Sequence, residues 1–196
     1  ANRERIGKDY LCELIQIVHE GRASSHPAFE SDEELRKKIT SALRSGARRM
    51  HFGNMRGHVN SKALEQAITA KYWEDRILGV NENRIFPNEI EFSMSANVGA
   101  SWPADLDLRM VKIKLFLPGE NPNARQFKHA DLHKWAKERR GGILSILAAM
   151  VQRWDQAGRP DGPTPFASFP EWGKVVGGIM TVNQLGDPCI PVDRED

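Results

Sequence analysis

Two short stretches of the sequence carry side chains that are suited to binding phosphate groups. The first begins with Gly7 and Lys8, just before a segment whose apolar residues recur at helical spacing. A helix N-terminus presents backbone N–H groups and a lysine adds a positive charge, so this pair suits a phosphate. Compared with the phosphate loop G-x-x-x-x-G-K-[ST], Gly7 and Lys8 match, but Asn2 stands at the first glycine and Asp9 at the Ser/Thr position. An ordinary glycine–lysine helix start is the alternative interpretation.

The second stretch, residues 85–117, predicts two strands joined by a loop. Residues 89–96 alternate apolar with small or polar side chains and stop at Asn97, and residues 110–117 alternate apolar residues with lysines. Arg109 lies directly before the second of these strands. Open α/β sheets bind ligands beyond the carboxyl ends of their strands, so Asn97 and Arg109 are candidates for such a site. An ordinary strand–loop–strand unit with a surface arginine is the alternative.

The first half of the chain supplies the elements that would position these residues. Helical spacing with start and stop signals predicts helices within residues 8–21, 31–46 and 61–68. Ser31 and Ser61 are placed to cap the second and third of these helices. Residues 48–52 predict a short strand that ends at Gly53 and Asn54. The alternation of helices and strands favours an α/β fold with a parallel sheet.

The second half of the chain is expected to be mainly helical. A Pro/Gly/Asn-rich stretch, residues 118–124, marks a boundary. Apolar residues at helical spacing follow it, with an interruption expected at Gly141 and Gly142 and a clean stop at Gly158.

The composition is that of a chain with a packed core, and it excludes several classes of protein. Of 196 residues, 40% are hydrophobic and 28% are charged, which is ordinary for a globular domain. The net charge of +2 is too small to argue for nucleic-acid binding by itself. The two cysteines, Cys12 and Cys189, lie far apart, so no disulfide framework is implied and a reducing cytoplasm fits. No apolar run approaches the roughly 20 residues of a membrane-spanning helix, and no signal peptide is visible.

Residues 71–115, KYWEDRILGVNENRIFPNEIEFSMSANVGASWPADLDLRMVKIKL, resemble the ATPase core of phage- and plasmid-type primase-helicases. These proteins are AAA+ ATPases related to superfamily 3 helicases. In them an "sDRxLG" segment precedes a strand that ends in an Asn-containing sensor, and a "DLxxR" segment with another strand follows. Residues 127–160, FKHADLHKWAKERRGGILSILAAMVQRWDQAGRP, are similar to their helical lid. The resemblance covers nearly the whole chain, from Gly7 to about Ile179.

The resemblance implies a role for each residue that matches the family pattern. Gly7 and Lys8 would form the end of the phosphate loop, with Lys8 contacting the β- and γ-phosphates. Asn97 would be the first sensor, which orients the attacking water or touches the γ-phosphate. Arg109 would be an arginine finger that acts across a subunit boundary on the charge of the transition state.

The implied fold is a P-loop NTPase core of AAA+ type in residues 1–118, incomplete at its N-terminus, with a helical lid and C-terminal helical segment in residues 119–196. Its first strand and the first half of the phosphate loop would precede Ala1, so residues 1–196 alone are expected to bind ATP weakly or not detectably. The implied function is Mg²⁺-dependent ATP binding and hydrolysis in a mobile-element DNA replication helicase. Such a protein would form a homo-oligomeric ring on single- or double-stranded DNA in the cytoplasm. The alternatives are a hydrolysis-deficient nucleotide-binding or assembly module, and a fragment whose helices pack against other domains.

Two positions depart from the family pattern. Asp9 stands where the phosphate loop has its metal-binding hydroxyl, and Gly53-Asn54 stands where an acidic pair is expected at the end of the neighbouring strand. Both positions are expected to face the same small volume. Two explanations stay open: the metal-binding carboxylate has moved across the site to Asp9, or the two changes are independent losses.

Further residues of interest lie outside these motifs. Arg139 or Arg140 would be a phosphate contact from the lid, or an ordinary solvated arginine at a helix end. Trp102 lies in a Gly/Ser/Pro loop, where a contact to DNA or to another subunit and simple packing are both open. The histidines of the first 60 residues lack zinc spacing and cysteine partners, so no zinc site is expected.

Overall fold

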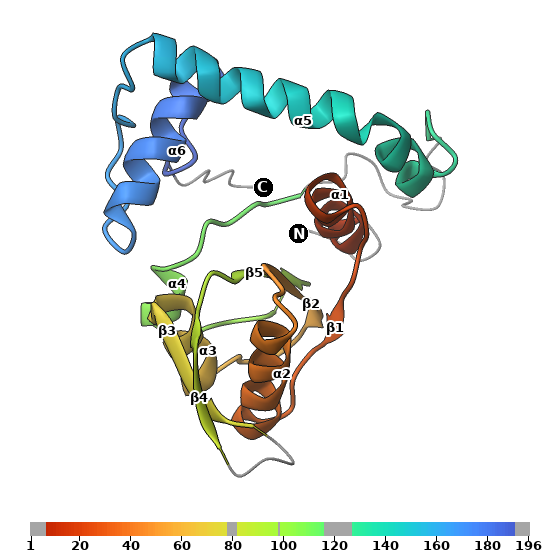
Figure 1. Cartoon of the computed structure of the whole chain (residues 1–196), viewed down its shortest axis with the longest axis vertical. Helices are drawn as coiled ribbons and strands as arrows, with labels where there is room; N and C mark the ends of the chain where they lie inside the picture. Colours follow the sequence, from red (N-terminus) through yellow and green to blue (C-terminus); the bar gives the residue numbers. More distant parts are fainter. Residues whose placement is uncertain (1–6, 78–81, 98, 116–126, 191–196) are drawn as a thin grey trace. The chain divides into compact units, whose positions relative to one another are not determined.

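The structure, a computed structural model, describes residues 7–77, 82–97, 99–115 and 127–190, and the chain divides into two compact units (Figure 1). The first unit comprises residues 1–103 and 116–127, and the second comprises residues 104–115 and 128–196. The division predicted between residues 118 and 119 falls outside the described residues.

The first unit is built on a parallel sheet of three strands in the order β1-β2-β5. The strands are β1 (His26–Pro27), β2 (Arg49–Met55) and β5 (Glu91–Ala96). Arg49 pairs with Glu91 and Phe52 with Met94, and the register shifts between Phe52 and Met55. The predicted α/β class with a parallel sheet is confirmed, and the strand expected to end at Phe52 runs on to Met55.

Helices cover both faces of this sheet (Figure 1). The helices are α1 (Lys8–Glu20), α2 (Asp32–Arg44) and α3 (Lys62–Thr69). α1 contacts β2 and β5 on one face, while α2 and α3 pack on each other on the opposite side. Both expected caps form, because Ser31 Oγ accepts the Glu34 N–H over 3.2 Å and Ser61 Oγ accepts the Leu64 N–H over 3.1 Å.

Residues 72–76 and 83–87 form the two antiparallel strands of a hairpin that the sequence pattern does not predict. β3 (Tyr72–Arg76) pairs along its length with β4 (Asn83–Pro87). Trp73 on β3 is fully buried, and its Nε1–H donates to Thr40 Oγ1 on α2 over 2.9 Å. Strands of five residues offer too few positions for an alternation of apolar and polar side chains to stand out.

A cluster of polar side chains ties this hairpin to α2. The Thr40 hydroxyl donates to Asp75 Oδ2 over 2.7 Å, and an Arg36 nitrogen lies 3.3 Å from Asp75 Oδ1. The Arg36 guanidinium also lies 5.0 Å from the centroid of the Trp73 ring. Burial raises the pKa of Asp75, but the hydrogen bonds that it accepts and the Arg36 charge lower it by more, so the pKa lies below its ordinary value. The cluster therefore favours the ionised carboxylate.

The described part of the second unit is helical. Its helices are α4 (Ala104–Asp107), α5 (Leu132–Gln156) and α6 (Pro170–Val182), and α5 packs on α6. α5 passes without a break through Gly141 and Gly142, where an interruption was expected. Each glycine in a helix interior costs only about 1 kcal/mol relative to alanine, which a helix of 25 residues can absorb. Nowhere in the described ranges is a helix long and apolar enough to cross a bilayer.

The segment that follows α5 packs its backbone directly on α6. The Gly162 N–H donates to the Lys174 carbonyl over 2.8 Å, and a Cβ added at Gly177 would lie 3.0 Å from Gly162 Cα. The Trp154 Nε1–H donates to the Pro160 carbonyl over 2.9 Å. The glycines of α6 are therefore a close-packing surface, because any larger residue would separate the two backbones.

The strand predicted at residues 110–117 does not form in residues 110–115, the part that the structure describes. Val111 and Ile113 are 44% and 67% exposed instead of covered. Alternation predicts an extended chain with two faces, but a strand also needs a neighbour to accept its hydrogen bonds, which the pattern does not reveal. Residues 116 and 117 lie outside the described residues.

Candidate functional site

The start of α1 presents backbone donors and a positive charge. Gly7 is the N-cap residue, with a φ of 98° in the left-handed region that glycine adopts without strain. Among the described residues, no side chain caps this helix. Lys8 and Asp9 are its first two residues. Within the part of the chain that the structure describes, the first-turn N–H groups are therefore open to solvent or to a ligand.

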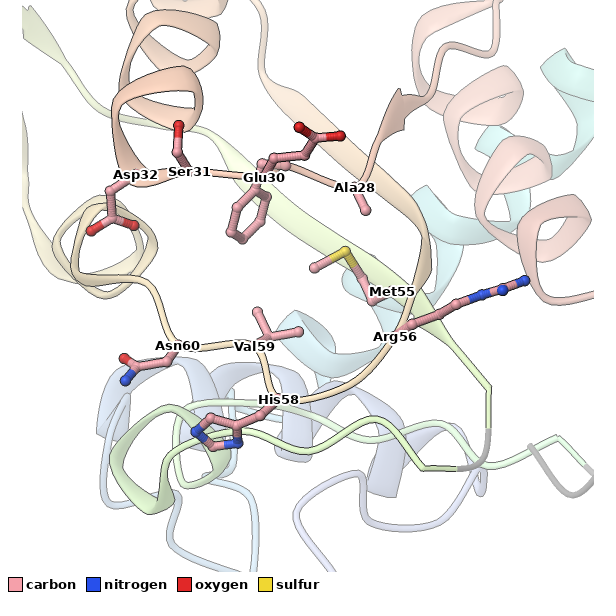
Figure 2. A pocket seen from close by; sticks show the side chains of 10 residues that line it. Ala28, Glu30, Ser31, Asp32, Met55, Arg56, His58, Val59 and Asn60 are labelled. Atoms are coloured by element: carbon pink, nitrogen blue, oxygen red, sulfur yellow. The ribbon is translucent and has the colours of Figure 1, made fainter.

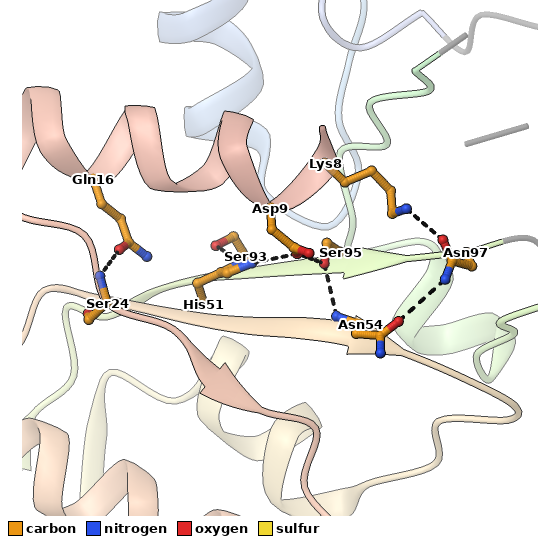
Figure 3. A network of polar contacts seen from close by, with 9 residues as sticks. All are labelled: Lys8, Asp9, Gln16, Ser24, His51, Asn54, Ser93, Ser95 and Asn97. Atoms are coloured by element: carbon orange, nitrogen blue, oxygen red, sulfur yellow. Dashed lines mark hydrogen bonds and ion pairs between the residues drawn. The ribbon is translucent and has the colours of Figure 1, made fainter. Parts of the chain in front are cut away.

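The polar side chains next to α1 come from one face of the sheet. Ser93, Ser95 and Asn97 stand at alternate positions at the end of β5, so they share a face. His51 and Gly53 of β2 lie on the same face, beside the first turn of α1 (Figure 3). His51 is 0% exposed and Ser95 is 4% exposed, so much of this network lies between the helix and the sheet.

Lys8 joins the carboxyl ends of β5 and β2 through two asparagines (Figure 3). Lys8 Nζ donates to Asn97 Oδ1 over 2.6 Å, and Asn97 Nδ2 donates to Asn54 Oδ1 over 3.3 Å. Asn54 has a φ of 58°, a left-handed conformation in which asparagine is enriched. Its backbone N–H donates to Ser95 Oγ over 3.0 Å. Residues 89 positions apart in the sequence thus meet at one point.

Asp9 lies over the position where β2 lacks a side chain. Its Oδ1 accepts a hydrogen bond from the Ser95 hydroxyl. His51 Nε2 lies 3.5 Å from the same oxygen, and His51 Nδ1 lies 3.0 Å from Ser93 Oγ. A Cβ added at Gly53 would lie 3.5 Å from Asp9 Oδ1. The expectation that Asp9 and position 53 face one small volume is therefore met.

Three residues of this network are missing from the sequence-based candidates. In the sequence, Ser93 and Ser95 are simply part of an alternating strand, and His51 is one of four histidines without zinc spacing. The signal that was available is the run of polar residues at alternate positions, SMSAN, which marks a polar strand face. That face is unusual beneath a helix, because buried polar groups require partners.

Arg109 belongs to the second unit. It follows α4, and its NH1 lies 2.6 Å from Asp105 Oδ2, with 25% of the Arg109 side chain exposed. Arg139 on α5 lies with its guanidinium 5.7 Å from the centroid of the Trp135 ring. The structure therefore brings Lys8, Asn97 and their neighbours together within the first unit and gives the two arginines local partners in the second.

A separate hollow of about 170 Å³ lies between the start of α2 and the residues after β2 (Figure 2). Asp32 on its rim accepts hydrogen bonds from the Ser61 hydroxyl over 2.5 Å and from the Lys62 N–H over 3.1 Å. This carboxylate already places a negative charge at the N-terminus of α3, so the hollow is a poor site for an anion.

The oxygen donors of the network suit only a cation that needs few protein ligands. Across the described ranges, no three His, Cys, Asp or Glu side chains gather in a way that would hold a metal ion. Asp9 is the one carboxylate among the residues drawn in Figure 3, and Ser95, Asn54 and Asn97 add neutral oxygens. Mg²⁺ is often held by one or two carboxylates together with phosphate oxygens and water, so this donor set fits Mg²⁺ at a nucleotide and no all-protein metal site.

Comparison of the chain with protein-family models, with curated proteins and with solved structures gives no match.

Proposed function

We propose that the chain is the ATP-binding module of a mobile-element DNA replication helicase, with a P-loop NTPase core and a C-terminal helical lid. One observation carries the proposal. Lys8 Nζ, at a helix N-terminus that no described side chain caps, lies 2.6 Å from Asn97 Oδ1 at the end of a parallel strand. The resemblance to AAA+ primase-helicases assigns Lys8 to the β- and γ-phosphates, and it assigns Asn97 to the attacking water or the γ-phosphate.

The geometry suits a phosphate because several donors converge on one place. Lys8 Nζ and Asn97 Nδ2 lie beside the first turn of α1, whose backbone N–H groups carry partial positive charge. A phosphate oxygen would replace Asn97 Oδ1 as the acceptor of Lys8. Asn97 would then be free to orient the attacking water. Mg²⁺, when bound, would neutralise charge on the phosphates, and Asp9 is the carboxylate in place to hold it.

The wider function follows from the same resemblance. Arg109 would act in a neighbouring subunit of a homo-oligomeric ring, after exchanging its ion pair with Asp105 for the γ-phosphate. The ring would act on DNA in the cytoplasm and couple ATP turnover to strand separation.

The test is nucleotide affinity in a matched pair of lysine variants. The protein should carry any native residues that precede Ala1, because a complete phosphate loop draws on residues before Gly7. We expect Lys8→Ala to weaken ATP binding by tenfold or more, which corresponds to about 1.4 kcal/mol. Lys62→Ala on α3 removes the same charge outside the network and should leave the affinity within about twofold. Equal effects of the two variants, or no ATP binding by the parent protein, would refute the proposal.

A second function, nucleotide binding without hydrolysis, is favoured by one specific observation. β2 carries Gly53 and Asn54 near its carboxyl end, where an acidic pair was expected, and Asp9 Oδ1 is already engaged by the Ser95 hydroxyl. Measurement of phosphate release separates the two functions. Stabilisation by ATP of about 2.7 kcal/mol at 100 times the dissociation constant, with no phosphate release from the assembled protein, would favour the binding or assembly module.

A further inference from the structure

We propose that Asp9 supplies, from α1, the carboxylate that β2 would otherwise place at the Mg²⁺ of a bound nucleotide, and that Ser95 and His51 hold it there. This inference rests on the proposed function and deepens it. It selects one of the two explanations left open by the sequence, namely that the carboxylate has moved across the site.

The first support is that position 53 and the Asp9 carboxylate occupy one volume. A Cβ at Gly53 would lie 3.5 Å from Asp9 Oδ1 and 4.0 Å from Asp9 Cγ. A longer side chain there would extend into the space that the carboxylate fills. An aspartate at position 53 would also bring a second negative charge against the first, which is unfavourable at such distances. The site therefore has room for one carboxylate, which either α1 or β2 can supply.

The second support is the way Asp9 is held. The Ser95 hydroxyl has one proton, and it is donated to Asp9 Oδ1 while the oxygen accepts the Asn54 N–H over 3.0 Å. This arrangement fixes the direction in which Ser95 donates. Within the described residues, Asp9 makes its side-chain contacts through Oδ1, and 52% of the Asp9 side chain is exposed. Oδ2 makes no hydrogen bond to another described residue, so it is the oxygen that a cation could bind.

The third support is a buried nitrogen that has no other explanation. His51 is 0% exposed, and its Nε2 has no hydrogen-bond partner among the described residues. Asp9 Oδ1, an acceptor, lies 3.5 Å from this nitrogen. With the proton on Nε2, His51 would direct a donor at Asp9 while Nδ1 accepts from the Ser93 hydroxyl. Buried polar atoms without partners are rare, and this one lies beside the carboxylate that it would help to hold in place.

The experiment removes the carboxylate from position 9, places one at position 53 instead, and measures how Mg²⁺ changes nucleotide affinity. Binding of a fluorescent ATP analogue is titrated with Mg²⁺ and with a chelator, and the ratio of the two dissociation constants is the readout. Binding of Mn²⁺ to the nucleotide complex, followed by electron paramagnetic resonance, gives a second readout that needs no turnover. The parent protein should bind the analogue at least about tenfold more tightly with Mg²⁺, as expected when a metal bridges protein and phosphates.

Asp9→Thr should reduce this ratio towards one while leaving the affinity in chelator within about threefold. Adding Gly53→Asp to Asp9→Thr should restore a substantial part of the ratio, because the carboxylate then stands on β2. Gly53→Asp alone should not raise this ratio above that of the parent protein. An unchanged ratio in Asp9→Thr, or no recovery in a folded double variant, would overturn the inference.

The positioning of Asp9 is tested separately. Ser95→Ala should lower the Mg²⁺ ratio severalfold without changing the affinity in chelator, and it should do so by more than Ser93→Ala, since Ser93 does not touch Asp9. A parent protein that binds the analogue equally well with and without Mg²⁺ overturns the inference and leaves the proposed function standing. A parent protein that does not bind under either condition removes both.

Discussion

Gly178 on α6 offers a prediction whose size can be worked out from the structure. A Cβ at this position would lie 2.1 Å from the Pro160 carbonyl oxygen and 2.7 Å from Trp154 Nε1. Neither atom is the end of a flexible chain free to move aside, because the two are joined by a 2.9 Å hydrogen bond. Gly178→Ala must therefore push the segment after α5 away from α6 and break that bond.

The expected cost combines three contributions. Overpacking of a well-packed contact costs about 1–3 kcal/mol, and loss of the Trp154 hydrogen bond costs about 1 kcal/mol. Replacing glycine by alanine within a helix returns about 1 kcal/mol. We therefore expect Gly178→Ala to lower the free energy of unfolding by about 1–3 kcal/mol.

Gly141→Ala on α5 is the matched control. No heavy atom lies within 4 Å of the Cβ that this change would add, so only the gain in helix propensity remains. It should raise the free energy of unfolding by up to about 1 kcal/mol. Urea denaturation of the full chain, followed by circular dichroism at the helix band, measures both. If Gly178→Ala proves at least as stable as Gly141→Ala, the close packing of α6 described above is wrong.

Three further predictions concern single side chains. Arg109→Ala should reduce ATP turnover by the assembled protein on the order of 10³-fold with little change in ATP affinity. Asp105→Ala, which removes only the ion-pair partner of Arg109, should not reduce turnover in this way. Undiminished turnover in Arg109→Ala would remove the finger assignment. Asp75→Asn should lower the free energy of unfolding by about 1 kcal/mol at neutral pH. Because the pKa of Asp75 is lowered in the folded protein, this loss should be complete above the ordinary pKa of 3.8 and should vanish as the pH falls through the folded pKa. Urea denaturation at stepwise lower pH measures it. Burial raises the pKa of the Cys12 thiol, and the Asp9 and Glu13 charges raise it further. Iodoacetamide should therefore modify Cys12 severalfold more slowly in the folded than in the unfolded chain, and Asp9→Asn should speed the reaction of the folded chain. Equal rates for the folded and unfolded chains would contradict this.

Local signals in the sequence predict the helices of the first unit and the parallel class of its sheet. Ser31 and Ser61 act as caps because each hydroxyl oxygen accepts the N–H of the residue three positions later. Such a bond depends only on the local sequence, so it can be predicted. The hairpin of β3 and β4 and the absence of a strand in residues 110–115 are not predicted by the same signals. In both cases the outcome depends on whether another strand is present, and alternation of side chains does not carry that information.

Some residues of the candidate site can be predicted from the sequence, and others cannot. Lys8, Asp9 and Asn97 stand out by residue type at the ends of predicted elements, and the structure brings them together. Ser95 and His51 do not stand out, because their importance comes from the register between β2 and β5 and from the placement of α1. A one-residue change of register would turn both side chains to the other face. Which polar residues of a strand serve a site is therefore decided by tertiary pairing.

The residues of the Lys8–Asn97 network lie far apart in the sequence, which affects when the network can form during folding. Helices α2 and α3 and the β3–β4 pair need only contacts between near neighbours, whereas the pairing of β2 with β5 must close a loop that spans α3 and the hairpin. Such non-local pairings form slowly. Lys8 has no partner in this network until Asn97 has been synthesised and β5 has docked. During translation the first turn of α1 leaves the ribosome long before its counterpart, so a nascent chain cannot capture a ligand between them.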